Sequence, residues 1–172
     1  VQVWAVTGGR RGIDVLVLGV AQALGVEPRL IHTQLNAPWR WLSPYKAAFR
    51  GVRDDPTIAP PYPDLVLASG RQAAAHARFI GLRSGGHSFT AFFQNPLINP
   101  QHFDFVWAPH HDRLQGPNVM STLLSPHMLT QEGLQADAET WRARLLDGAG
   151  AKTPIAVLIG GPNSAYAFSR DE

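Results

Sequence analysis

The sequence His110-His111-Asp112 carries the side chains best suited to acid–base chemistry, and it follows an apolar run typical of a strand. Histidine titrates close to neutral pH and can take a proton from a hydroxyl group, while a nearby carboxylate orients the ring. We therefore predict His110 as a general base and Asp112 as its orienting partner. No third ligand stands at a useful spacing, so no metal and no cofactor are predicted. The structural alternative is that His110 bonds loop backbone and Asp112 caps a turn.

Glycine-containing turns after predicted strands offer a second kind of chemistry, the binding of a polar or anionic group. A helix that starts at such a turn has free N–H groups, which attract phosphate and other anions. Tight turns and ordinary helix caps would use the same residue types, and the spacing in the first turn departs from dinucleotide and P-loop motifs. The predicted substrate-binding turns are Gly8-Gly9-Arg10 and Ser69-Gly70-Arg71, and a later turn is Gly160-Gly161-Pro162-Asn163-Ser164.

Amide side chains at predicted strand ends or loops, Gln94, Asn95 and Asn118, could bond to sugar hydroxyls or could tie the loops together. The tryptophans between residues 33 and 63 could line an acceptor groove or touch a membrane or partner, but we favour a role as core at the sheet edge. The other histidines stand alone in the sequence, and we predict that they lie on the surface or are satisfied internally. They are His32, His76, His87, His102 and His127.

Short apolar runs that alternate with helical patterns would position these candidates. A strand, a glycine turn and a helix in succession predict parallel strands joined by crossover connections. The predicted fold class is α/β, Rossmann-like, with a mostly parallel sheet and helices on both faces. The predicted strands cover residues 2–7, 27–32, 65–68, 89–94, 103–108, 119–124 and 154–159, and the predicted helices cover 13–24, 44–49, 72–80 and 137–146.

Length and composition limit the domain organisation and the partners. The 172 residues are predicted to form an N-terminal domain over 1–150 and, over 151–172, a linker with the first strand and loop of a truncated second domain. A net charge of +2 without a run of basic residues gives no indication of nucleic-acid binding. Zero cysteines exclude disulfides and thiolate sites and agree with a cytoplasmic location.

A set of short motifs occurs in a fixed order along the chain. They are Pro63-Asp64-Leu65-Val66 with Ser69-Gly70-Arg71, Gln94-Asn95-Pro96, Phe103-Asp104-Phe105-Val106 with Pro109, His110 and Asp112, Gly116-Pro117-Asn118-Val119, and Ile159-Gly160-Gly161-Pro162. This ordered set resembles the mitochondrial-fission "elongated mitochondria" family, over its N-terminal domain and the opening of its second. One stretch departs from the family pattern, because Gly12-Ile13-Asp14-Val15-Leu16 stands where members usually carry a Gly-His-Glu-Asn-Gln-like run.

The resemblance implies a bacterial protein similar to GT-B glycosyltransferases, with two Rossmann-like domains facing a cleft. The second domain would hold a nucleotide-sugar donor, through Gly160, Gly161, Asn163 and Ser164. The first domain would hold an acceptor of unknown identity, and this chain alone would not catalyse transfer. One alternative is a non-enzymatic recruitment protein of the fission-family type, with a protein partner or peripheral contact at the inner membrane. The other is a nucleotide-dependent Rossmann enzyme.

Overall fold

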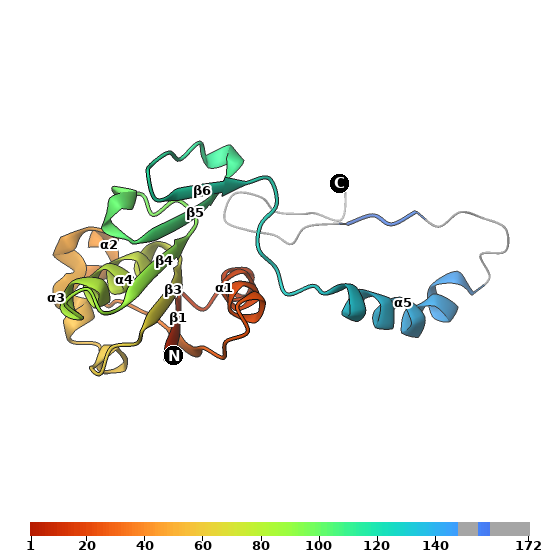
Figure 1. Ribbon diagram of the computed structural model, residues 1–172, viewed down its shortest axis with the longest axis horizontal. Helices are drawn as coiled ribbons and strands as arrows, with labels where there is room; N and C mark the ends of the chain where they lie inside the picture. The colour runs from red at the N-terminus through yellow and green to blue at the C-terminus, as the bar shows by residue number, and fades with distance from the viewer. Residues whose placement is uncertain (148–154, 159–172) are drawn as a thin grey trace. The chain divides into compact units, whose positions relative to one another are not determined.

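The structure is a computed structural model that describes residues 1–147 and 155–158. The chain divides into a first unit of residues 1–129 and a second unit that begins at Thr130. The first unit is a parallel sheet of six strands in the order β2-β1-β3-β4-β5-β6. Helices lie on both faces of this sheet (Figure 1), which confirms the predicted α/β, Rossmann-like fold.

The strands are the apolar runs of the sequence, each ended by a polar, glycine or proline residue. The inner strands are largely buried, as parallel strands with helices on both faces must be. The edge strand β2 buries only Ile31, which suits its single neighbour. The strands are β1 (Val3–Thr7), β2 (Arg29–His32), β3 (Leu65–Ser69), β4 (Phe89–Phe93), β5 (Phe105–Pro109) and β6 (Val119–Thr122).

Two long helices pack on opposite faces of the sheet. Helix α1 (Arg11–Ala23) buries Leu16 and Val17 against Ala5 and Leu67. Helix α4 (Arg71–Arg83) packs on the other face with a row of alanines, whose small side chains allow the helix to approach the sheet closely. The two glycine turns that precede these helices therefore lie at the same edge of the sheet.

One face of the sheet is only partly covered within residues 1–129. Helix α1 packs over the β1–β3 side, and an apolar groove of about 560 Å³ remains over β4, β5 and β6. The groove is apolar because Phe93, Phe105 and Trp107 alternate onto this face. Among the described residues, no helix is long and apolar enough to cross a membrane.

The segment between β2 and β3 folds into short helical turns on the α4 side of the sheet (Figure 1). The predicted helix over 44–49 is displaced, since its residues begin a turn that continues to Arg53. Trp39 is half-buried in this segment, whereas Trp41 is 61% exposed and does not act as core. The turns are α2 (Trp39–Leu42), η1 (Lys46–Ala48), α3 (Phe49–Arg53) and η2 (Pro56–Ile58).

The second unit, as far as it is described, contains helix α5 (Gln131–Leu146). The predicted start at Asp137 is wrong, because Thr130 is the N-cap and its side-chain oxygen accepts a hydrogen bond from the Gly133 N–H at 3.1 Å. Residues 155–158 were predicted to lie in a buried strand, but they are exposed and have no regular secondary structure. The predicted boundary at residue 150 lies outside the described residues.

Candidate functional site

The candidate site lies at the carboxyl ends of β1 and β3. In the sheet, β1 lies between β2 and β3. The chain places β2 on one side of β1 and then returns to add β3 and the later strands on the other side. This is the point at which the order of a doubly wound sheet reverses, and ligands of such folds bind there, outside the carboxyl ends of the strands.

Two glycine turns meet at this point. Gly70 has φ +100°, and a Cβ atom on it would lie 3.9 Å from the Gly8 nitrogen and 3.5 Å from the Ile13 side chain. Neither α1 nor α4 has a side chain that caps its N-terminus. Their free N–H groups border a pocket of about 330 Å³ lined by Gly8, Arg10, Ile13, Gly70, Arg71 and Gln72. Uncapped helix N-termini carry partial positive charge, so the pocket favours an anionic group.

Arg71 is committed to the protein's own backbone. Its Nε donates to the Ser43 carbonyl at 2.7 Å and its guanidinium also donates to the Trp41 carbonyl at 3.0 Å. The Ser43 hydroxyl donates in return to the Arg71 carbonyl at 2.7 Å. The residue borders the pocket but uses much of its donor capacity to fix the α2 segment to the start of α4.

The side chains of Ser69 and Asn95, also predicted at this edge, make internal contacts. The buried Ser69 hydroxyl donates to the Phe93 carbonyl at 2.5 Å, so it joins β3 to β4. Gln94 has φ +109°, a conformation that is strained for a residue with a side chain. The Asn95 side chain accepts from the Leu97 N–H at 2.9 Å, which closes a tight turn.

A hydrogen-bonded series of Thr7, Asp14 and His32 lies beside the first glycine turn. The Thr7 hydroxyl donates to one Asp14 oxygen at 2.5 Å, and His32 Nε2 lies 3.1 Å from the other. The Gly9 N–H donates to the Thr7 hydroxyl at 3.2 Å. The Asp14 side chain is 15% exposed and that of His32 is 47% exposed. A nearly buried carboxylate therefore orients an accessible imidazole.

This arrangement can perform acid–base chemistry. Because the carboxylate of Asp14 accepts from Nε2–H, the neutral ring of His32 presents an unprotonated Nδ1. That atom is near Gly9, whose Cβ position would be 3.6 Å from it. Sequence reasoning missed this pair. Two features of the sequence pointed to it: Asp14 follows the glycine turn, and His32 ends a predicted strand. The pairing of β1 with β2, which sets His32 beside Thr7, could not be predicted from the sequence.

The predicted pair His110 and Asp112 lies at the same edge but in a separate cluster. Both residues are in the short 3₁₀ turn η4 (His110–Asp112), after β5. The Asp112 carboxylate is 3.6 Å from Nε2 of the exposed His111. It therefore contacts His111 and not His110, the residue that it was predicted to orient. Strands β3 and β5 are separated by β4, so this cluster is displaced by about 10 Å along the sheet from Gly70.

Asn118 does not belong to the site. It precedes β6, and since all strands are parallel it lies at the amino edge of the sheet, opposite the glycine turns. Its Nδ2 donates to the carbonyls of Pro100, in η3 (Pro100–His102), and of Phe103, at 2.9 and 2.8 Å. The side chain therefore ties loops together.

A second pocket of about 480 Å³ adjoins the site through His32. It is lined by His32, Gln34, Asn36, Trp39, Gly51, Asp54, Asp55 and Pro56.

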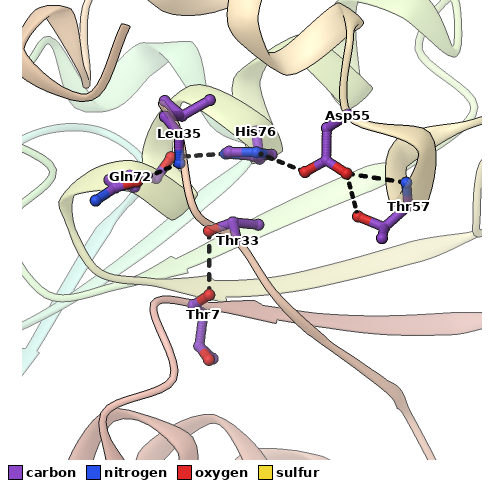
Figure 2. A network of polar contacts seen from close by, with 7 residues as sticks. All are labelled: Thr7, Thr33, Leu35, Asp55, Thr57, Gln72 and His76. Atoms are coloured by element: carbon purple, nitrogen blue, oxygen red, sulfur yellow. Dashed lines mark hydrogen bonds and ion pairs between the residues drawn. The ribbon is translucent and has the colours of Figure 1, made fainter. Parts of the chain in front are cut away.

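A buried polar network holds one wall of this second pocket (Figure 2). His76, which is completely buried, has Nδ1 2.9 Å from the Gln72 carbonyl and Nε2 3.4 Å from Asp55. Asp55 also accepts from Thr57, at 2.9 Å from its N–H and 2.6 Å from its hydroxyl. The contact with His76, followed by the bonds from Thr57, outweighs burial and lowers the pKa of Asp55 to about 2.

The same network fixes the chain that leaves β2 (Figure 2). The Thr33 hydroxyl donates to the Thr7 carbonyl at 3.1 Å, and the Leu35 N–H donates to the Gln72 side chain at 2.7 Å. Thr33 and Leu35 are buried while Gln34 and Asn36 are exposed, so the segment keeps the alternation of a strand beyond its end.

The predicted donor-binding residues Gly160, Gly161, Asn163 and Ser164 lie outside the described residues. Within residues 1–147 and 155–158, no group of three or more histidine and acidic side chains is arranged to hold a metal ion.

Comparison with known families gives a match to the chain. The model of the family described as mitochondrial fission ELM1 matches residues 12–172. The matched region includes Asp14, His32 and the second glycine turn. No curated protein and no solved structure matches the chain.

Proposed function

Since the chain belongs to the mitochondrial fission ELM1 family, we propose that it is a glycosyltransferase-like protein that uses a nucleotide-sugar donor. Residues 1–129 would form the acceptor side of its site. The observation that carries this proposal is the Asp14–His32 pair, which presents an accessible imidazole beside two uncapped helix N-termini. Glycosyl transfer from a nucleotide sugar needs a base for the acceptor and positive potential for the diphosphate that leaves.

In the proposed glycosyl transfer, His32, Asp14 and the two helix N-termini each have a role. His32 Nδ1 takes the proton of an acceptor hydroxyl as its oxygen forms a bond to the anomeric carbon of the donor sugar. The bond from that carbon to the diphosphate breaks, and the nucleoside diphosphate leaves. Asp14 stabilises the imidazolium that forms, because its carboxylate is 3.1 Å from Nε2. The N-termini of α1 and α4 offset negative charge on the leaving group.

Thermal unfolding of the intact protein with a panel of nucleoside diphosphates and nucleotide sugars tests donor binding. A ligand that binds only the folded state at about 100 times its Kd adds ~2.7 kcal/mol. A protein of this size should then melt roughly 5–10 °C higher. The nucleotide that gives the shift identifies the donor base. A folded protein whose melting temperature does not respond to any of them would contradict the proposal.

His32→Gln tests the base. The variant should lose about 10²–10⁴-fold in transfer rate while keeping the shift in melting temperature with nucleotide. His87→Gln is the matched control, because His87 pairs with Asp64 at 3.0 Å but precedes β4, at the opposite edge of the sheet. Equal rates for the two variants would remove His32 from the mechanism.

A recruitment protein of the fission-family type is the second candidate. The exposed side chains of Trp41, Leu42 and Tyr45 favour it, since they lie close together in the chain and have little apolar cover. This function would leave melting temperatures independent of nucleotides.

A further inference from the structure

The second pocket, beside His32, has the composition of a site for a neutral polar ligand. The chain after β2 presents His32, Gln34 and Asn36 at alternate positions, and all line the pocket. Within the described residues, neither amide side chain makes a hydrogen bond to the protein. Each amide can donate and accept hydrogen bonds, and a hydroxyl group of a ligand can do the same.

Trp39 forms an apolar wall of this pocket and is held in place. A Cβ atom at Gly51 would be 2.6 Å from the Trp39 side chain. The indole therefore fits against position 51 only because glycine has no side chain. The Arg50 guanidinium lies 6.0 Å from the centre of the indole ring. A fixed aromatic wall supplies a large apolar surface at a low cost in conformational entropy.

The carboxylates in the pocket do not favour a charged ligand. Asp55 is committed to His76 and Thr57, and Asp54 is 3.1 Å from Nε of Arg53. Both carboxylates are therefore already engaged by groups of the protein. What remains is a set of hydrogen-bonding amides facing an apolar ring, in a volume of about 480 Å³, which is within the usual range for small-molecule sites.

We propose that this pocket binds a pyranose sugar, with Trp39 against its C–H face and Gln34 and Asn36 bonded to its hydroxyl groups. Resting on the proposed function, this sugar is the acceptor, because His32 lines the pocket and its ring is oriented by Asp14. The acceptor class is then a glycan or a glycoconjugate that ends in a neutral sugar.

Saturation-transfer NMR on the intact protein, without nucleotide, tests the pocket. The probes are the methyl glycosides of glucose, galactose, mannose and N-acetylglucosamine, with adenosine and uridine as competitors. At least one glycoside should bind. Gln34→Ala and Asn36→Ala should each raise its Kd roughly three- to tenfold, the effect of one lost hydrogen bond. Gln115→Ala, an exposed glutamine in another loop, should leave the Kd unchanged.

Trp39→Ala should abolish binding, and Trp39→Phe, which keeps an aromatic wall over Gly51, should retain it. Absence of binding by every glycoside, equal Kd values in all variants, or displacement of the sugar by a nucleoside would each overturn the sugar site. Sugar binding in a protein that no nucleotide stabilises would keep the site and contradict the transferase. Nucleotide binding and sugar transfer without glycoside binding would support the transferase and contradict the sugar site.

Discussion

Replacement of Asp55 by asparagine should remove the charge that faces buried His76. His76 is surrounded by acceptors, with the Gln72 carbonyl at Nδ1 and the Asp55 carboxylate at Nε2. Asp55→Asn keeps an oxygen that can accept from Thr57, so the cap of η2 remains. The variant therefore isolates the contact between the carboxylate and the imidazole.

The pKa of Asp55 sets an upper limit on the effect, because the contact with His76 and the bonds from Thr57 together lower this pKa from 3.8 to about 2. A lowering of that size corresponds to roughly 2.5 kcal/mol of folding free energy at neutral pH. The side chain is 16% exposed, and solvent screens part of the interaction. We therefore expect Asp55→Asn to lower the free energy of unfolding by ~1–2 kcal/mol at pH 7.

The sign of the pH dependence also follows. The carboxyl has a lower pKa in the native state, so the unfolded state binds more protons as the solution is acidified. The stabilisation is complete above about pH 4 and is lost as the pH falls towards 2, where the native carboxyl is also protonated. At pH 3 the difference between wild type and Asp55→Asn should be about half its value at pH 7.

Urea unfolding at pH 7 and pH 3 measures these differences. Asp54→Asn is the matched control, because Asp54 is the preceding residue and forms a surface pair with Arg53. It should change the free energy of unfolding by less than ~0.5 kcal/mol at either pH. If Asp55→Asn is no more destabilising than Asp54→Asn, or if its effect is the same at both pH values, the contact between the Asp55 carboxylate and the His76 imidazole does not stabilise the protein.

Three further substitutions test the geometry at the two edges of the sheet. Gly70→Ala should destabilise the protein by ~1–2 kcal/mol because its φ is +100°, whereas Gly12→Ala, in open space on α1, should stabilise it by about 0.5–1 kcal/mol; calorimetry would show opposite shifts in melting temperature. Asn118→Ala should cost ~1–3 kcal/mol in urea unfolding through its bonds to the Pro100 and Phe103 carbonyls. Any shift with nucleotide should survive that change, since Asn118 is at the amino edge.

The sequence was sufficient to predict the fold class of residues 1–129. Apolar runs such as Leu65–Ala68, each followed by a turn and a helical pattern, predict parallel strands because the period of hydrophobicity changes from strand to helix. The glycine at position 70 marked a turn that needs positive φ. Local patterns of this kind also placed both glycine turns at the carboxyl ends of strands, where the pocket lies.

The candidate base was not predictable for a physical reason. Asp14 and His32 meet only because β2 pairs with β1 in a register that sets His32 beside Thr7. The sequence does not state which strand neighbours β1, and each residue has an ordinary local explanation. His110 and Asp112 were favoured because they are adjacent in the chain, but adjacency in a turn directs the carboxylate to His111 instead.

The roles of Ser69 and Arg71 depended on contacts across the chain. Their position at the end of β3 was predicted, but the Phe93 and Ser43 carbonyls that occupy them come from other segments. A hydrogen-bonding side chain at a strand end is equally suited to a ligand and to a neighbouring carbonyl. The folded positions of β4, for Ser69, and of the α2 segment, for Arg71, decide between the two.

The alternation after β2 links the buried network to the second pocket, beside His32. Thr33 and Leu35 are fixed by Thr7 and Gln72 inside the protein, and this fixation is what turns Gln34 and Asn36 outward. Because side chains alternate along an extended chain, a shift of one residue would exchange the two sets and bury the amides. The hydrogen bonds of Thr33 and Leu35 thus determine which face of the segment borders the pocket, although neither residue lines it.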